Sequence, residues 1–257
     1  MNRIQQLFHN KKENILSVYF CAGHPTLEST IPNIKALQNG GIDMVEIGIP
    51  FSDPLADGPT IQGAASKALK NGMSLHKLFD QLENVRQSVS MPLILMGYLN
   101  PILHYGYEDF CRRCQEVGID GLIIPDLPFD RFQLEYADIT KRYGLELIFL
   151  VTPETPETRI REIDAHSSGF IYAVSSASVT GAQQSFSDAK QAYFARLQSM
   201  HLNNPLLVGF GISNKATREA ACAYTSGVIV GSKFVTLLSE SPSPDVAVEK
   251  LIKALEE

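Results

Sequence analysis

Residues 38–47 read QNGGIDMVEI, and the same order of features returns in QEVGIDGLII (115–124) and KRYGLELIFL (141–150). In each stretch a polar helical end is followed by glycine and then by an apolar run. Glycine at this point suits the left-handed conformation that ends many helices and turns the chain into the next element. The repeated pattern therefore predicts helices that alternate with buried strands.

Eight short apolar runs are spaced along the chain, with helical patterns between them. Nearly continuous apolar runs are typical of parallel strands that are covered on both faces. This alternation in 257 residues predicts an α/β fold, a single (β/α)8 TIM barrel domain over residues 1–257 with an extra N-terminal helix. The alternative, an open doubly wound sheet, rarely has eight strands at such even spacing. The predicted strands are 15–23, 44–50, 92–98, 121–126, 146–153, 170–176, 205–212 and 227–234.

The bulk properties exclude several classes of partner. The net charge is −6 and no basic stripe is present, so no nucleic acid is expected to bind. No apolar run approaches the ~18 residues that a membrane span requires. Lys11 and Lys12 precede ILSVYFCAG (15–23) as in a secretion signal, but HPT follows where a cleavage region needs small residues. We therefore expect a first core strand here, in a cytoplasmic protein.

Two of the four cysteines, Cys111 and Cys114, form a C-x-x-C motif within a helical pattern. Cys114 shares a helical face with Phe110 and Val117, which predicts a core position. A zinc site needs a second pair of ligands, and none is suitably spaced. We expect reduced structural thiols and no metal. The histidines also lack ligand spacing and are expected in loops or on the surface.

A carboxylate lies in the middle of the second predicted strand, within VEIGIPFSDPLADGP (45–59). Burial of Glu46 without a partner raises its pKa toward neutrality, where a carboxyl group can give and take protons. Asp57 follows in the next loop, and two carboxylates in different environments can divide acid and base roles. Two alternatives remain open: Glu46 is a buried carboxylate with a structural partner, and Asp57 is a turn residue before Gly58.

Glycine and hydroxyl residues follow the last three predicted strands. Barrels that bind phosphorylated substrates hold the phosphate beside strands seven and eight, on backbone N–H groups at a helix N-terminus. Glycines at these strand ends let the backbone approach an anion closely. The sequence therefore predicts a phosphate site, formed from Thr180, Gly181, Gly209, Gly211, Ser213, Gly231 and Ser232.

The stretch VEIGIPFSDPLADGPTIQ (45–62) resembles the signature of the tryptophan synthase alpha subunit family. Supporting motifs occur in the order and at the spacing of that family, and the resemblance covers essentially the whole chain. It implies a (β/α)8 barrel that cleaves indole-3-glycerol phosphate into indole and glyceraldehyde 3-phosphate, a retro-aldol step in tryptophan biosynthesis. The supporting motifs are LMGYLNP (95–101), PDLP (125–128), VTGA (179–182), GFGIS (209–213) and GSKF (231–234).

The resemblance also implies roles for individual residues and a partner. Glu46 is implied as the catalytic acid/base, Asp57 as the second catalytic carboxylate, and Asp53 as part of the loop that faces a beta subunit. That partner carries pyridoxal phosphate and receives indole through a tunnel in an alpha-beta-beta-alpha heterotetramer, whereas this chain needs no cofactor. Substrate-pocket positions are Tyr19, Tyr98, Tyr172 and Thr180, and phosphate-binding positions are Gly181, Gly211, Gly231 and Ser232.

The chain departs from the family pattern at His24, Ser176 and Ser178, where relatives often have an acid, Arg and Gly. Loss of the glycine predicts a stiffer loop over the site. Two other functions remain as alternatives: a catalytically weak subunit that activates its beta partner, and a different phosphate-binding barrel isomerase. The presence of Glu46 and Asp57 argues against the first, and the PFSDPLADGP stretch argues against the second.

Overall fold

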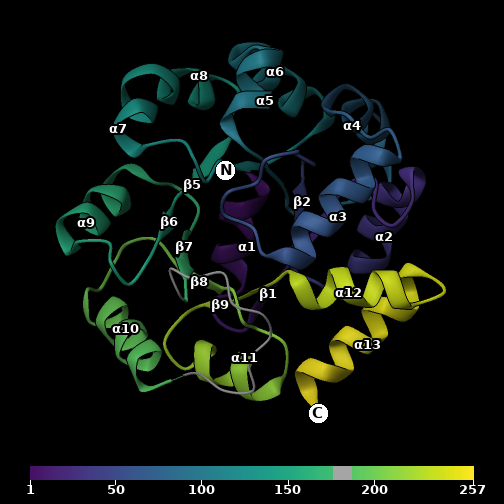
Figure 1. Cartoon of the computed structure of the whole chain (residues 1–257). Coiled ribbons are helices and arrows are strands. Elements are labelled where there is room, and N and C mark those ends of the chain that lie inside the picture. The colour runs from purple at the N-terminus through teal and green to yellow at the C-terminus, as the bar shows by residue number, and fades with distance from the viewer. Residues whose placement is uncertain (176–186) are drawn as a thin grey trace.

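A computed structural model describes residues 1–175 and 187–257, with parallel strands surrounded by helices (Figure 1). The sheet order is β5-β4-β3-β2-β1-β9-β8-β7-β6, so neighbours in the sheet are neighbours in the chain except where β1 meets β9. The strands are β1 Ile15–Cys21, β2 Met44–Gly48, β3 Leu93–Met96, β4 Gly121–Ile123, β5 Glu146–Ile148, β6 Leu150–Val151, β7 Ile171–Val174, β8 Leu206–Gly209 and β9 Gly227–Val230.

The sheet closes on itself through the fifth predicted strand. That strand, expected to run unbroken over 146–153, is divided at Phe149 into β5 and β6. These two short strands are the two ends of the sheet order, so consecutive residues of the chain join the ends. The carbonyl of Phe149 accepts a hydrogen bond of 3.0 Å from the N–H of Tyr172. The predicted barrel is therefore confirmed, and the open sheet is excluded.

Helices alternate with the strands and form the outer ring of the barrel (Figure 1). The bounds are α1 Arg3–Asn10, η1 Leu27–Ser29, α2 Thr30–Asn39, α3 Pro59–Lys70, α4 Leu75–Leu82, η2 Val85–Gln87, α5 Leu99–Tyr105, α6 Tyr107–Val117, α7 Phe129–Arg131, η3 Phe132–Tyr136, α8 Ala137–Arg142, α9 Glu157–His166, α10 Asp188–Ser199, α11 Lys215–Cys222, α12 Ser232–Glu240 and α13 Pro244–Glu256.

The helix–glycine–strand pattern has the predicted backbone geometry. Gly118 ends α6 with a φ of 80°, and Gly144 follows α8 with a φ of 68°. After α6, the N–H of Ile119 bonds to the carbonyl of Cys114 at 2.8 Å, which closes the helix end. Glycine makes these turns without the steric penalty that other residues have at positive φ.

The extra N-terminal helix α1 is confirmed and lies across the barrel (Figure 1). Arg3 forms an ion pair of 3.0 Å with Asp120, which precedes β4, and Gln5 donates a hydrogen bond of 2.7 Å to Glu146 at the start of β5. Ile4 between them is fully buried. The helix therefore closes the N-terminal end of the barrel, and the carboxyl ends of the strands remain for a site.

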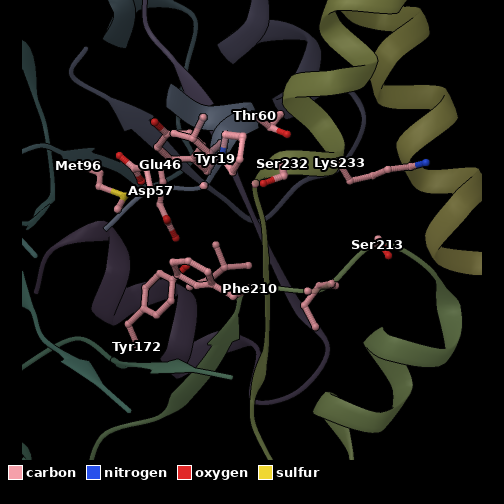
Figure 2. Close-up of a pocket in the computed structure, with 17 residues that line it drawn as sticks. Tyr19, Glu46, Asp57, Thr60, Met96, Tyr172, Phe210, Ser213, Ser232 and Lys233 are labelled. Carbon is pink, nitrogen blue, oxygen red and sulfur yellow. The ribbon is translucent and has the colours of Figure 1, made fainter. Parts of the chain in front are cut away.

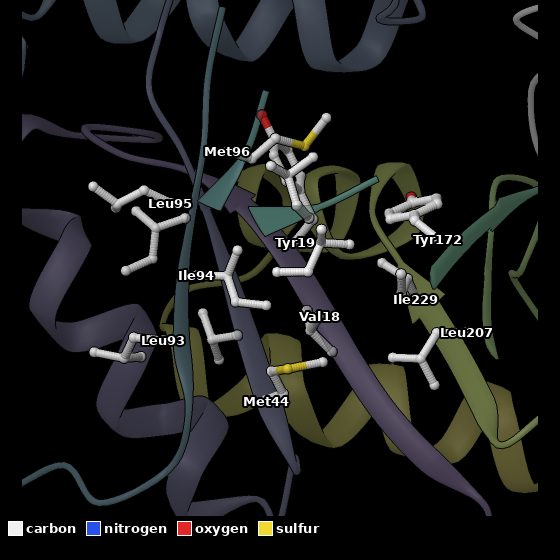
Figure 3. Packing of buried hydrophobic residues seen from close by; sticks show 14 of the residues in the cluster. Val18, Tyr19, Met44, Leu93, Ile94, Leu95, Met96, Tyr172, Leu207 and Ile229 are labelled. Atoms are coloured by element: carbon white, nitrogen blue, oxygen red, sulfur yellow. The ribbon is translucent and has the colours of Figure 1, made fainter. Parts of the chain in front are cut away.

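The core is one continuous cluster that extends from the barrel interior to the helices outside it. Figure 3 shows part of it, including Val18, Leu95 and Leu207 from three different strands. All four cysteines are free thiols, and Cys111 and Cys114 are buried in α6 as expected. Within residues 1–175 and 187–257, no helix has both the length and the apolar character needed to cross a membrane.

Candidate active site

A pocket of about 820 Å³, partly open to solvent, lies at the carboxyl ends of the strands (Figure 2). This is the end at which barrel enzymes hold their reacting groups. The residues that line it are Tyr19, Glu46, Asp57, Gly58, Pro59, Thr60, Ile61, Met96, Tyr172, Phe210, Gly211, Ile212, Ser213, Ile229, Gly231, Ser232 and Lys233.

Glu46 is fully buried on β2, in register with Tyr19 of β1. The hydroxyl of Ser17 donates a hydrogen bond of 2.9 Å to its Oε1, and Oε2 has no partner among the described residues. Burial raises the pKa of Glu46 to about 8, although the Ser17 hydrogen bond opposes the increase. A carboxyl group with this pKa can carry a proton at neutral pH and release it during a reaction.

Asp57 reaches the same pocket from the loop between β2 and α3. The hydroxyl of Tyr98 donates a hydrogen bond of 2.9 Å to its Oδ2. Burial raises the pKa of Asp57, and the Tyr98 hydrogen bond opposes this by favouring the ionised form. The loop thus brings a second carboxylate to the pocket, as the sequence predicted, and gives it a different hydrogen-bond partner from Glu46.

Two tyrosines of the pocket lie against glycines of neighbouring strands. A β-carbon at Gly48 would overlap the hydroxyl of Tyr19, and one at Gly209 would overlap the hydroxyl of Tyr172. Both glycines stand two residues beyond the register partner of the tyrosine, on β2 and β8 respectively. Any larger side chain at either position would displace the ring, so these glycines determine where the two tyrosines lie.

The far side of the pocket is formed by the ends of β8 and β9. Gly211 has a φ of 79°, and Phe210 before it has a φ of 69°, an uncommon conformation for a bulky residue. Gly231 caps the N-terminus of α12, where Ser232 and Lys233 form its first turn. Figure 2 shows Ser213 and Lys233 on the side of the pocket away from Glu46 and Asp57. Open backbone N–H groups at such a helix start favour an anion.

Most of the predicted pocket residues lie at the pocket, and a few do not. Tyr98 is buried and holds Asp57, but it is not part of the pocket lining. Asp53 is exposed on the loop after β2. Thr180 and Gly181 lie outside the described residues, as do Ser176 and Ser178.

His24 lies in a loop, in line with the expectation that the histidines lie in loops or on the surface, but this loop position is not exposed. It follows β1 but is buried, and its Nε2 lies 3.0 Å from the hydroxyl of Ser239 in α12. The sequence pattern of HPT did not indicate this burial.

Several residues of the site were not predicted from the sequence. Met96, Thr60 and Phe210 line the pocket, and so does Lys233, a cation in the first turn of α12. Ser17, the partner of Glu46, was also missed. Its signal was present in ILSVYFC (15–21), where a serine interrupts an otherwise apolar strand two residues before Tyr19.

Known proteins match the chain over its whole length. The model of the family described as "Tryptophan synthase alpha chain" matches residues 5–257. The chain belongs to the tryptophan synthase alpha chain family. Alpha chains of Bacteroides thetaiotaomicron and Parabacteroides distasonis are each 61% identical, covering 99% and 100% of this chain and all of their own.

Solved alpha chain structures have the same fold. The tryptophan synthase alpha subunit of Legionella pneumophila is 32% identical with a TM-score of 0.89, covering 99% of this chain and 97% of its own. A chain of the Pyrococcus furiosus tryptophan synthase complex is 33% identical with a TM-score of 0.84, and the match covers 95% of this chain and 98% of that one. The family cleaves indole-3-glycerol phosphate in tryptophan biosynthesis, so this alpha chain is a carbon–carbon lyase.

Proposed function

We propose that Glu46 and Asp57 carry out the cleavage of indole-3-glycerol phosphate in this chain. The observation that supports this assignment is the pair of carboxylates on one pocket, Glu46 with an unpartnered oxygen and a pKa raised to about 8, and Asp57 held by Tyr98. The two groups come from different elements and have different surroundings. Such a difference allows one carboxyl group to exchange protons while the other remains charged.

The reaction needs two proton transfers around one bond. Glu46 starts protonated and gives its proton to the ring carbon that carries the side chain, which makes the indole ring cationic. The Glu46 carboxylate then takes the proton of the hydroxyl on the adjacent side-chain carbon. The carbon–carbon bond breaks, its electron pair returns to the ring, and the products are indole and an aldehyde. Glu46 is protonated again at the end of the cycle.

Asp57 stabilises the cationic ring that forms between these transfers. An ionised carboxylate near the ring nitrogen interacts more strongly with the cation than with the neutral substrate, so it lowers the barrier. The Tyr98 hydrogen bond favours the ionised form of this carboxylate and holds it in place. The chain needs no cofactor for these steps, because every transfer is made by a carboxyl group.

Measurement of indole release from the purified chain tests the assignment. Glu46→Gln retains the shape of the side chain and is expected to lose at least ~10²-fold in kcat, the usual scale for a general acid or base. Glu146→Gln is the matched control, because Glu146 is also buried but lies at the opposite end of the barrel against α1. Near wild-type turnover in Glu46→Gln would contradict the assignment and leave Glu46 as a buried carboxylate with a structural role.

We assign the phosphate of the substrate to the far side of the pocket. Gly211, Gly231 and Ser232 supply backbone N–H groups there, with Thr180 and Gly181 expected to complete the site. Lys233 adds positive charge near the same place. A crystal soaked with sulfate or a substrate analogue is expected to show the anion between the ends of β8 and β9. An anion bound only elsewhere would contradict this placement.

The partner of this chain is a tryptophan synthase beta subunit, which carries pyridoxal phosphate, in an alpha-beta-beta-alpha heterotetramer. Asp53 and Leu55 are exposed on the loop that leads to Asp57, and Leu55 is 89% exposed. We expect the beta subunit to dock over this loop and to accelerate cleavage by moving Asp57. The expected coupling is about 1–3 kcal/mol, the usual range between linked sites.

The cleavage rate with and without saturating beta subunit tests this docking. Asp53→Ala is expected to reduce the stimulation more than the basal rate. Asp80→Ala, an exposed acid on α4, is the control and should leave the stimulation unchanged. Equal stimulation in wild type and Asp53→Ala would remove Asp53 from the interface.

We further propose that residues 1–257 form one domain and work in the cytoplasm. The single continuous core supports the first point, because the helices at both ends of the chain contribute to it. The four free thiols support the second, because a reducing compartment keeps cysteines in this form.

A further inference from the structure

Strand β1 contributes two hydroxyl groups to the surroundings of Glu46. Ser17 and Tyr19 are two residues apart, so their side chains point to the same face of the strand. Tyr19 is in register with Glu46, and Ser17 is in register with Met44, closer to the N-terminal end of the barrel. Tyr19 lines the pocket, whereas Ser17 is fully buried beneath it.

The Ser17 hydroxyl is the only hydrogen-bond partner of the Glu46 carboxyl group among the described residues. It donates to Oε1 at 2.9 Å, and Oε2 is buried with no partner there. An unpaired buried oxygen is costly in a protein interior, and functional sites are where such groups occur. The two oxygens of Glu46 are therefore not equivalent.

We infer that Ser17 is a positioning residue for the cleavage reaction: it holds Oε1 of Glu46 and leaves Oε2 as the oxygen that carries the proton to the substrate. Because Oε1 already accepts the serine proton, the acid form of Glu46 bears its own proton on Oε2. The inference rests on the proposed role of Glu46 as the acid/base.

The serine hydrogen bond has a larger effect on the charged form of Glu46. When the proton leaves Oε2 for the ring carbon, negative charge develops on the carboxyl group inside an apolar core. The hydroxyl of Ser17 donates to that charge, and hydrogen bonds to ionised groups are stronger than those to neutral ones. Ser17 therefore stabilises the state in which Glu46 has given up its proton.

Other groups around Glu46 also influence its titration. Tyr19 on β1, Tyr172 on β7 and Asp57 on the loop after β2 all line the same pocket. The two tyrosines are neutral at physiological pH, because burial raises the pKa of each far above its usual value. Met96 on β3 is apolar and adds only to the exclusion of water. The hydrogen bond to the carboxyl group comes from Ser17 and from none of these four neighbours.

The test compares two variants that differ only in the hydroxyl. Ser17→Thr and Ser17→Val have nearly the same shape, so any strain from the added methyl groups is common to both. We expect Ser17→Thr to keep kcat within about 3-fold of wild type. Ser17→Val is expected to lose roughly 10- to 100-fold in kcat with little change in KM, the range for a hydrogen bond to a charged group.

The pH profile supplies a readout that a structural role would not change. Cleavage requires protonated Glu46 at the start, so kcat falls above its pKa, near pH 8 in wild type. The Ser17 hydrogen bond lowers this pKa, and its loss is expected to move the alkaline limb to higher pH in Ser17→Val but not in Ser17→Thr. Thr140→Val is the control, because Thr140 is a buried hydroxyl on α8 bonded to Tyr107.

A second comparison uses the Glu46→Gln background. If Ser17 acts through Glu46, the difference in kcat between Ser17→Thr and Ser17→Val disappears when each is combined with Glu46→Gln. A difference that persists would overturn the inference, as would equal kcat and equal pH profiles in the Glu46 protein. A faster Ser17→Val would also overturn it, because the bond would then hold Glu46 away from the substrate.

Three measurements distinguish failure of this inference from other failures. The turnover of Glu46→Gln is measured before that of any Ser17 variant, because a value near wild type contradicts the proposed function itself. Ser17→Ala is expected to lose kcat as Ser17→Val does, and its side chain is smaller than serine, so it causes no overlap. Thermal unfolding of every variant shows that it is folded before its kinetics are compared.

Discussion

The hydroxyl of Tyr98 donates a hydrogen bond of 2.9 Å to Oδ2 of Asp57, and the oxygen of that hydroxyl accepts a hydrogen bond of 3.0 Å from the N–H of Ala56. One side chain from the end of β3 thus holds both a carboxylate and the backbone of the loop that carries it. The ring of Phe51, from the start of that loop, lies 5.3 Å from the ring of Tyr98. The position of Asp57 therefore depends on a residue outside the pocket lining.

Tyr98→Phe is expected to lower kcat by roughly 10-fold or more, because it removes a hydrogen bond to a charged group and releases the loop. Indole release at saturating substrate measures the effect. Tyr107→Phe is the matched control, since its buried hydroxyl bonds to Thr140 and neither residue lines the pocket. Unchanged kcat in Tyr98→Phe would show that the loop holds Asp57 without this hydrogen bond.

Asp57→Asn retains the oxygen that accepts from Tyr98 but removes the negative charge. We expect a loss of roughly 10²-fold in kcat, the scale for removal of one group that stabilises a transition-state charge. KM should change little, because the interaction strengthens only when the ring becomes cationic. A rise in KM alone would identify Asp57 as a binding residue.

Gly48→Ala is expected to destabilise the chain by about 1–3 kcal/mol, the usual cost of an overpacked core, because the new methyl group overlaps Tyr19. Gly63→Ala is a control for which the expected change in the free energy of unfolding has the opposite sign. Gly63 lies in the interior of α3 with nothing within 4 Å of a β-carbon, so alanine should stabilise by about 1 kcal/mol. Urea unfolding measures both.

The side chain that a methyl group at Gly48 would overlap is Tyr19. Tyr19→Leu shortens the side chain, so it is expected to relieve most of the cost of Gly48→Ala in the double variant. The interaction energy from a double-mutant cycle reports this coupling. Additive effects of the two substitutions would show that the clash is relieved elsewhere.

The raised pKa of Glu46 predicts how stability depends on pH. The folded chain keeps the Glu46 proton up to about pH 8, whereas the unfolded chain releases it near 4.5. Between these values the folded state binds the extra proton, so its stability falls as pH rises, by up to about 1.4 kcal/mol per pH unit. Glu46→Gln removes this dependence while other groups titrate alike in both proteins.

The free energy of unfolding of wild type minus that of Glu46→Gln is therefore expected to fall steadily from pH 5 to pH 8. Urea unfolding of both proteins at each pH measures it. A difference that stays constant over this range would mean that Glu46 is already ionised in the folded state.

The barrel fold could be predicted from local sequence patterns. The turn at Gly118 and the continuous apolar strands follow from backbone sterics and from burial on both faces, which depend on neighbouring residues alone. The position of Glu46 within an apolar strand likewise predicted a buried carboxyl group. The break at Phe149 could not be predicted from the sequence, because the apolar run continues through it and only closure of the barrel divides the strand.

Contacts between distant segments could be decided only by the tertiary structure. The sequence by itself determined that Glu46 lies within a buried strand and that Asp57 follows in the next loop, and it indicated glycines suited to an anion. It did not determine that Ser17 bonds to Glu46, that Tyr98 holds Asp57 or that His24 is enclosed. Hydrogen bonds of this kind join residues 29 and 41 positions apart, and their geometry depends on how strands and loops pack rather than on any local preference.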